Sequence, residues 1–230
     1  MKTVGLIGGM SWESTVVYYQ LVNRIVRQRL GGLHSARLLM WSFDFAEIEG
    51  YQAAGDWETA TVSMIDAARS VERGGAQCIV ICTNTMHKMA GEVQKAVDIP
   101  LIHIGDATAN AIKVSGVESP LLLATRYTME QDFYKGHLHE KHGINVCIPN
   151  DEDRTVVHNV IYHELCQGVI SRESKQRYLD VIAKALKDGA DSVIFGCTEV
   201  GLLISQTDFQ APVFDTTELH AIAAVDFALS

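Results

Sequence analysis

A cysteine between a short apolar run and a helical pattern is the side chain of this sequence best placed for chemistry. Cys197 and the preceding Gly196 follow Ser192–Phe195, a run typical of a buried strand. In α/β proteins, ligands bind at the carboxyl ends of parallel strands. A helix starting just after the thiol would offer free N–H groups and partial positive charge, which lower a thiol pKa and hold an anion. The sequence therefore predicts an activated thiol at an anion-binding turn.

An earlier stretch of the chain repeats this pattern. Residues 75–85 align without a gap on residues 189–199, so that Thr83 stands at the position of Cys197 and Cys82 stands one residue early. Internal repetition of this kind indicates duplicated structural units. We therefore expect two similar halves, each with a polar turn at the end of a buried strand.

Strand and helix patterns alternate along the whole chain and predict an α/β fold with parallel sheets. Strands are expected at Val4–Ile7, Ala36–Phe43, Cys78–Ile81, Leu101–Ile104, Pro120–Ala124, Ile144–Ile148, Ser192–Phe195 and Val213–Phe214. Helices are expected at Val16–Arg27 with Ser11 as N-cap, Trp57–Arg73 with Asp56 as N-cap, Met86–Val97, Ala107–Val114 with Asp106 as N-cap, a stretch to about Lys141 with Thr128 as N-cap, roughly Arg154–Gln167 and Arg172–Lys187, and about Thr217–Leu229.

These patterns predict two pseudo-symmetric parallel-sheet α/β halves that face each other across a cleft. The first half is expected at residues 1–115 and the second at 116–230, and the last helix, about 216–230, is free to pack on the first half. The strand-end turns of both halves would line the cleft.

Two opposed reactive side chains suit a reaction at both faces of one carbon atom. Racemisation α to a carboxylate is such a reaction, because one group removes the α-proton and the other returns a proton on the opposite face. The developing charge on the carboxylate must be stabilised by hydrogen-bond donors. Asn84 and Thr85 on one side, and Thr198 and Glu199 on the other, are the predicted donor-bearing residues.

Three motifs in order, Gly8–Thr15, Thr83–His87 and Gly196–Glu199, resemble the aspartate/glutamate racemase family, and in particular its L-aspartate/glutamate-specific branch. The resemblance covers the whole chain. It implies an isomerase that needs no pyridoxal or other cofactor, binds a small amino acid between two pseudo-symmetric α/β halves, and racemises it by two-base proton transfer.

The chain departs from this family at one catalytic position. The family normally has Cys-Asn-Thr where this chain has Thr83-Asn84-Thr85, and the resemblance makes that cysteine one of two catalytic thiols. An alcohol is far less acidic than a thiol, so Thr83 is a poor base but still able to relay a proton. Cys82 points the opposite way from Thr83 if the strand continues. The resemblance assigns Cys197 to the L-isomer.

Further substrate contacts are expected on the neighbouring turns. Met10 and Ser11 lie on the first turn and offer backbone N–H groups, and Thr125 ends the first strand of the second half. The resemblance places Gln52 and Cys166 near positions where some relatives carry basic residues for a side-chain carboxylate. An amide and a thiol there favour neutral polar amino acids beside aspartate and glutamate.

Composition indicates the cellular compartment and excludes some classes of partner. The chain has 230 residues, a formal charge of −9 and a pI of about 5.4, which argue against nucleic acid and anionic membranes as partners. Five cysteines without a paired spacing favour a reducing cytoplasm. The sequence shows neither a signal peptide nor a membrane span, and leaves a homodimer open.

Other chemistries remain as alternatives. His137, His139 and His142 lie at spacings that spread them over a helix, so no metal site is expected. A nucleophilic Cys197 would suit a related thiol-dependent hydrolase or isomerase, such as a hydantoin racemase or maleate isomerase type. A non-catalytic amino-acid-binding protein is the third reading.

Overall fold

The computed structural model describes residues 1–230 and divides them into two compact units. Unit 1 comprises Met1–Ile104 and His220–Ser230, and unit 2 comprises Gly105–Leu219. The chain therefore passes between the units twice, after Ile104 and after Leu219. The sequence-based boundary at residue 115 stays a prediction about the duplicated halves.

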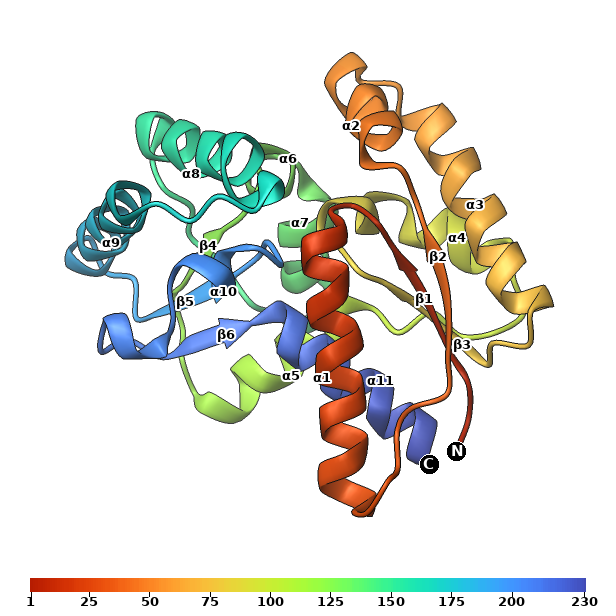
Figure 1. Ribbon diagram of the computed structural model, residues 1–230. Coiled ribbons are helices and arrows are strands. Elements are labelled where there is room, and N and C mark those ends of the chain that lie inside the picture. The colour runs from red at the N-terminus through yellow and green to blue at the C-terminus, as the bar shows by residue number, and fades with distance from the viewer. The chain divides into compact units, whose positions relative to one another are not determined.

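Unit 1 is built on three parallel strands in the order β2-β1-β3 (Figure 1). Their bounds are β1 (Val4–Gly8), β2 (Leu38–Ser42) and β3 (Cys78–Ile81). β1 and β3 are short apolar runs that are buried throughout, as is typical of parallel strands between helices, whereas the edge strand β2 is partly exposed. The strand expected at Leu101–Ile104 is wrong: Leu101 makes only an isolated bridge to Ile79, and Ile104 already begins a helix.

Helices cover both faces of the unit 1 sheet. They are α1 (Trp12–Leu30), α2 (Phe45–Ala54), α3 (Trp57–Arg73), the 3₁₀ turn η1 (Thr85–Met89), α4 (Ala90–Lys95) and, from His220 on, α11 (Thr216–Leu229). Ser11 and Asp56 cap α1 and α3 through their side chains, as predicted. The helix expected at Met86–Val97 is instead split into η1 and α4.

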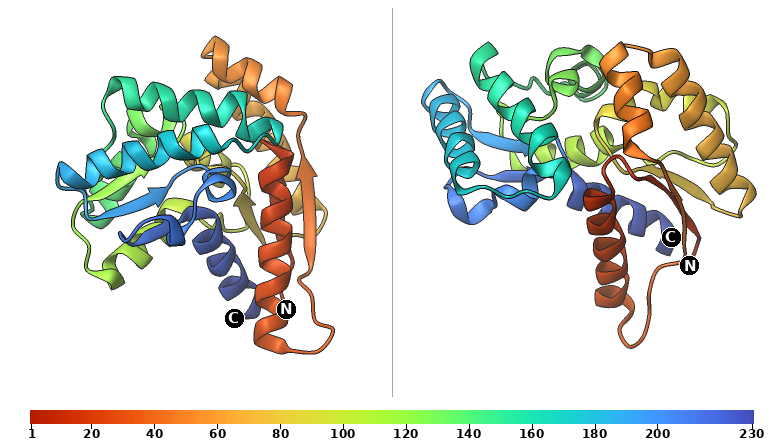
Figure 2. Two further views of the ribbon diagram at one scale, coloured as in Figure 1. Left: turned by 60° about the vertical axis from the view of Figure 1, so that its left-hand side comes forward. Right: turned by 45° about the horizontal axis from the view of Figure 1, so that its top comes forward.

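Alternating side chains of β1 and β3 build two separate cores. Ile7, Ile79 and Ile81 pack with α3 residues such as Met64, on one face of the sheet. The other face packs against α1 and α11 (Figure 2) and contains Val4, Leu6, Tyr18, Val22, Val26, Cys78, Val80, Cys82, Ala221, Ala224, Val225 and Ala228. The period of two in a strand therefore decides which face each side chain meets.

Unit 2 has a second parallel sheet in the order β4-β5-β6. Its strands are β4 (Pro120–Leu123), β5 (Ser192–Phe195) and β6 (Val213–Asp215). The strand expected at Ile144–Ile148 is wrong, because Cys147 alone forms an isolated bridge to Leu121.

The helices of unit 2 include α9, whose bounds are as expected, and several that begin at other residues than expected. They are α5 (Ile104–Ser115), α6 (Arg126–Glu130), α7 (Asp132–His142), α8 (Asp151–His163), η2 (Leu165–Gln167), α9 (Arg172–Lys187), α10 (Val200–Leu203) and η3 (Gln206–Asp208). Asp106 and Thr128 are not N-caps. Asp106 lies inside α5, and Thr125 caps α6 by accepting a hydrogen bond from the Thr128 N–H.

The two sheets repeat one arrangement, which supports the predicted duplication. β3 and β5 occupy aligned positions of the repeat, and Val4 pairs with Cys78 as Pro120 pairs with Ser192. Each sheet also carries one isolated parallel bridge at its edge. The fold class is α/β with two parallel three-stranded sheets.

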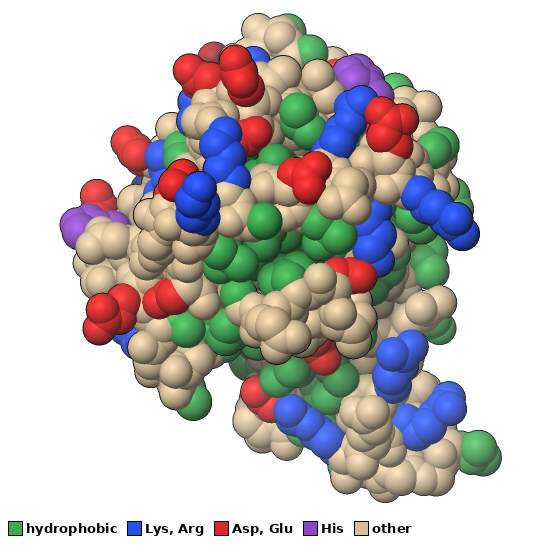
Figure 3. All heavy atoms as spheres, turned by 90° about the vertical axis from the view of Figure 1, so that its left-hand side faces the viewer, with side chains coloured by type: hydrophobic (Ala, Val, Ile, Leu, Met, Phe, Trp, Pro, Cys, Tyr) green, Lys and Arg blue, Asp and Glu red, His purple; other side chains and the backbone are tan.

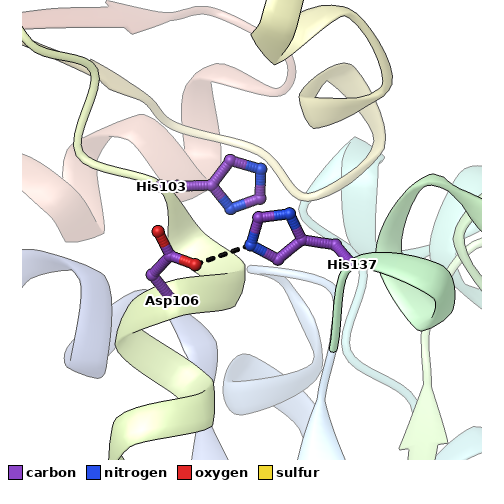
Figure 4. A group of neighbouring side chains, drawn as sticks. All are labelled: His103, Asp106 and His137. Carbon is purple, nitrogen blue, oxygen red and sulfur yellow. Dashed lines mark hydrogen bonds and ion pairs between the residues drawn. The ribbon is translucent and has the colours of Figure 1, made fainter. Parts of the chain in front are cut away.

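A charged clasp joins α5 to α7 in unit 2. Asp106 Oδ1 accepts hydrogen bonds from Nε2 of His137 at 2.6 Å and of His142 at 2.7 Å, and Oδ2 lies 2.7 Å from Lys141 Nζ. Figure 4 shows the bond between Asp106 and His137. These bonds hold the pKa of Asp106 well below its usual range, although burial opposes them. Lys141, together with Lys113 beside His142, would repel a divalent cation.

The surface carries charges of both signs. Acidic and basic side chains are interspersed around hydrophobic ones on the face drawn in Figure 3. No helix combines the length and the apolar character needed to cross a membrane.

Gly196, directly after β5, packs closely against β4 and the residue that follows β4. A Cβ at this position would lie 2.4 Å from Leu122 Cδ1 and 3.1 Å from Ala124 Cβ. We expect Gly196→Ala to lower the free energy of unfolding by about 1–3 kcal/mol, because overpacking a buried contact forces neighbours to move. Urea denaturation measures this change.

Gly136→Ala is the matched control in the same unit. Its Cβ would make only an ordinary contact with Asp132, at 3.5 Å inside α7. It should stabilise the protein by up to about 1 kcal/mol, since alanine favours helix. Equal stability of Gly196→Ala and the unchanged protein would contradict the packing argument.

The clasp predicts a pH-dependent loss on Asp106→Asn. Because the folded-state pKa of Asp106 is depressed, its contribution is complete above the unfolded pKa of about 3.9 and disappears as pH falls further. We expect the variant to lose about 1–3 kcal/mol near neutral pH and progressively less below about pH 4. Urea denaturation at several pH values measures the difference.

Asp153→Asn serves as the comparison, because it removes a single pair with the half-exposed Lys184. It should cost less than about 1 kcal/mol. A loss from Asp106→Asn that is the same at acidic and at neutral pH would count against the clasp.

Candidate active site

The polar turns of unit 1 gather at the carboxyl edge of its sheet. Ile7 pairs with Ile81, and Cys82 N donates to Ile7 O at 2.8 Å. Phe43 N donates to Gly8 O at 3.0 Å, which brings in the end of β2. Because the strands are parallel, the turns after β1, β2 and β3 therefore lie side by side.

Cys82 and Thr83 have different surroundings at the end of β3. Cys82 continues the alternation of Cys78 and Val80, packs in the core against α1 and α11, and is 1% exposed. Burial raises the pKa of the Cys82 thiol far above its usual range. Thr83 follows at the turn and is 8% exposed. This arrangement argues against Cys82 as a replacement base.

Asn84 and Thr85 continue the turn into η1. Both are buried, and Asn84 occupies the N-cap position without a side-chain capping bond. The Asn84 carbonyl accepts the N–H of His87 at 3.1 Å, and the Thr83 carbonyl accepts Nδ1–H of the same residue at 2.8 Å. The 3₁₀ turn is therefore closed by main-chain and side-chain bonds to His87.

Met10 and Ser11 hold the beginning of α1. The Ser11 hydroxyl accepts the Ser14 N–H at 3.4 Å, and its carbonyl accepts the Thr15 hydroxyl at 2.8 Å. The Met10 side chain is buried in the core that also contains Met86. Their predicted contribution to substrate binding through backbone N–H groups stays a prediction.

Gln52 lies on α2. It is 3% exposed, and its Nε2 donates to the Met86 sulfur at 3.2 Å. The structure thereby connects Gln52 with the turn that contains Thr83, because Met86 follows Thr85 directly. A substrate contact by Gln52 remains to be tested.

The matching edge of unit 2 holds Thr125 and Cys197. Thr125 follows β4 and caps α6, while the Gly196 N–H donates to Leu123 O at 2.8 Å. The ends of β4 and β5 therefore lie together, as do those of β1 and β3 in unit 1.

Cys197 forms a hydrogen-bonded dyad with Glu199. The buried thiol donates to Glu199 Oε2 at 2.8 Å, and the Thr198 hydroxyl donates to the same oxygen at 2.8 Å. Burial first, and then the negative charge of Glu199, raise the pKa of Cys197 well above its usual range. The carboxylate is thus the group that receives the thiol's hydrogen bond.

This geometry corrects the expectation of an acidified thiol. The helix after Cys197, α10, has only four residues and starts at Val200. Burial and the adjacent carboxylate outweigh the effect of such a short helix, so that the thiol is the stable form.

Two residues near Cys197 were not identified from the sequence. Tyr178 on α9 is fully buried, and burial first, and then its closeness to Cys197 and Glu199, raise its pKa. Its hydroxyl donates to Val157 O at 2.9 Å. Glu164 contributes to the same negative environment and accepts the Ser174 hydroxyl at 2.6 and 2.8 Å.

The sequence contains little to indicate these two residues. Tyr178 lies on the apolar face of an amphipathic helix, and Glu164 lies in a helical pattern that the structure breaks between α8 and η2. Cys166, which the family resemblance places near the site, lies in η2 and is among the groups that raise the pKa of Cys197.

Each unit therefore offers a different chemical group at the carboxyl edge of its sheet. Unit 2 has a thiol with an adjacent proton acceptor, which can move a proton between sulfur and a carboxylate. Unit 1 has the Thr83 hydroxyl on the turn that leads into η1. The cooperation of Thr83 with Cys197 stays a prediction.

Known proteins are similar to this chain in sequence and in fold. The family model of Asp/Glu/Hydantoin racemase matches residues 7–224. A Yersinia pestis protein assigned to the Asp/Glu racemases has a crystal structure that is similar over 100% of both chains, with 54% identity and a TM-score of 0.92. An aspartate racemase homologue from Pyrococcus horikoshii is 35% identical over 100% of both chains, with a TM-score of 0.86.

A curated relative is more distant. The broad specificity amino-acid racemase RacX of Bacillus subtilis is 23% identical over 182 residues, which are 76% of this chain and 75% of RacX. The family match and the close structural relatives agree with the three sequence motifs and with the two parallel sheets. The chain belongs to the Asp/Glu/Hydantoin racemase family, a family of isomerases.

Proposed function

We propose that this protein is a cofactor-independent amino-acid racemase that removes the α-proton of L-amino acids through Cys197. The observation that carries the proposal is the bond from the Cys197 thiol to Glu199, at the carboxyl end of β5 in a chain of the racemase family. A base must be deprotonated before it acts, and this contact supplies an acceptor for the thiol proton.

The proposed reaction begins with a proton transfer inside unit 2. The Cys197 proton moves to Glu199 Oε2, and the sulfur lone pair of the resulting thiolate takes the α-proton of the substrate. The electrons of the broken C–H bond remain on the substrate as a carbanion whose charge spreads onto its carboxylate. Backbone N–H groups of the strand-end turns, together with the substrate ammonium group, are proposed to stabilise that charge.

Thr83 is proposed to act from the opposite face of the α-carbon. Its hydroxyl is neutral and far less acidic than a thiol, so it can return a proton to a carbanion but is a weak base. The mechanism therefore predicts efficient attack on L-isomers and poor attack on D-isomers.

The proposed substrates are L-aspartate, L-glutamate and related polar amino acids. The buried amide of Gln52 and the thiol of Cys166 provide no positive charge for a side-chain carboxylate. The name of the B. subtilis relative, a broad specificity racemase, agrees with such a range. The five cysteines of this chain form no disulfide, which supports the cytoplasm as the compartment, and a homodimer remains part of the proposal.

Removing the Glu199 charge should make the Cys197 thiol easier to alkylate while it slows catalysis. Glu199→Gln keeps a hydrogen-bond acceptor but removes the charge that raises the pKa of Cys197. Alkylation of Cys197 by iodoacetamide should therefore begin at lower pH, while α-hydrogen exchange falls about 100-fold because the proton acceptor is lost. Site-resolved mass spectrometry follows the alkylation.

Thr198→Val is the control, because it removes the second hydrogen bond to the same oxygen without changing any charge. The pH at which Cys197 alkylation begins and the rate of α-hydrogen exchange should both change much less than in Glu199→Gln. Alkylation that begins at the same or higher pH in Glu199→Gln would contradict the assigned electrostatic role.

Isotope exchange tests the one-sided mechanism directly. In deuterated water, L-aspartate and L-glutamate should exchange the α-hydrogen at least about tenfold faster than their D-isomers, since only Cys197 is a competent base. Thr83→Cys should raise exchange from the D-isomers, and Cys197→Ala should abolish exchange from the L-isomers. NMR and chiral chromatography measure both quantities.

Equal exchange from both enantiomers of the unchanged protein would refute the mechanism. A substrate adduct on Cys197 detected by mass spectrometry would favour a thiol hydrolase or isomerase instead. Binding of amino acids by calorimetry without any exchange would favour a binding protein.

A further inference from the structure

Both ring nitrogens of a buried histidine connect the Thr83 turn with another part of unit 1. Nδ1 of His87 lies 2.8 Å from the carbonyl oxygen of Thr83. Nε2 lies 3.2 Å from the backbone nitrogen of Ile104, where the first segment of unit 1 ends. The side chain is 3% exposed.

These two partners determine the protonation of the ring. The Ile104 N–H can only donate, so Nε2 must be the accepting nitrogen. The Thr83 carbonyl can only accept, so Nδ1 must carry the proton. His87 is therefore a neutral imidazole with its proton on Nδ1, and both of its hydrogen-bonding atoms are used in fixed directions.

Neighbouring rings restrict the orientation of His87. His103 contacts it edge-on with ring centres 4.7 Å apart, and His220 does so at 5.6 Å. His220 is itself fixed, because its Nε2 lies 2.6 Å from Ile102 O and its Nδ1 lies 2.9 Å from the Tyr18 hydroxyl. A change of ring orientation at His87 would disturb this packed group.

We propose that His87 is a positioning residue for Thr83, one that fixes the main chain at Thr83 and thereby the place from which its hydroxyl delivers a proton. The proposal rests on the proposed racemase function. The bond is made to the carbonyl of the same residue that bears the hydroxyl, so a shift of that peptide moves the hydroxyl directly. Backbone placement of this kind controls proton transfer, because the donor must lie within hydrogen-bond reach of its target.

The proposal makes a selective kinetic prediction. Return of a proton at the Thr83 face inverts the substrate. Loss of the hydrogen bond between His87 and the Thr83 carbonyl should therefore slow this inversion. It should leave exchange with retention at Cys197 nearly unchanged, because Cys197 lies in unit 2 and has its own acceptor, Glu199. The ratio of inverted product to exchanged L-substrate is therefore the informative quantity.

Two substitutions separate the two hydrogen bonds. His87→Asn keeps an amide donor at about the distance of Nδ1 from Cβ and so retains the bond to Thr83. His87→Gln keeps an amide oxygen at about the distance of Nε2 and retains only the bond to Ile104. Both lose the ring packing, which makes each the control for the other.

With L-aspartate in deuterated water, His87→Gln should lower the inversion-to-exchange ratio about tenfold, the effect of one lost buried hydrogen bond, while His87→Asn should keep it within about twofold of the unchanged protein. An equal fall in both variants, or a fall in exchange with no change in the ratio, would overturn the positioning role.

A second measurement does not depend on catalysis. The double variant Thr83→Cys, Cys197→Ser carries a thiol at position 83 whose alkylation rate is measured by tandem mass spectrometry. This rate should change about tenfold on adding His87→Gln and stay within about twofold on adding His87→Asn. If the unchanged protein exchanges no amino acid, the racemase proposal fails, and this comparison still decides whether His87 positions residue 83. Equal rates in the two variants would overturn the inference.

The protonation of His87 can also be tested in the protein without substitutions, so this test does not depend on the stability of the variants. In ¹⁵N-histidine NMR spectra, His87 should show the neutral ring with its proton on Nδ1. A proton on Nε2 instead would be incompatible with the Ile104 bond and would refute the inference.

Discussion

A buried thiol beside a buried carboxylate determines which proton transfers unit 2 can perform. Cys197 is 2.8 Å from Glu199 Oε2 and is stable as the protonated form, since ionising it would place a second negative charge in a site shielded from water. In the proposed mechanism, the ammonium group of a bound substrate brings positive charge near the sulfur and thereby favours the thiolate. In this mechanism the thiolate therefore forms mainly when a substrate is bound, which limits side reactions of a free thiolate.

Much of the architecture could be predicted because it follows from short-range patterns. Buried strands such as Cys78–Ile81 and Ser192–Phe195 are marked by continuous apolar runs, and the repeat places them at equivalent positions. The period of two in a strand also separates Cys82 from Thr83 correctly, because the structure packs Cys82 in the core and leaves Thr83 at the turn.

Other features depend on contacts between residues far apart in sequence. Asp106 resembles a helix cap in the sequence, yet α5 begins at Ile104 and the carboxylate binds three side chains of α7. The raised pKa of Cys197 likewise depends on tertiary burial, whereas the sequence suggests only a helix start. Tyr178 becomes part of the site through the packing of α9, which no local pattern records.

The discontinuity of unit 1 affects how the protein folds as it is synthesised. Unit 2 is one continuous segment and is complete once Leu219 has been made. Unit 1 begins first but lacks Ala221, Ala224, Val225 and Ala228 of its core until α11 has been made. The part of this core that α11 covers therefore stays exposed while unit 2 is being made, and apolar surface exposed at that stage favours aggregation.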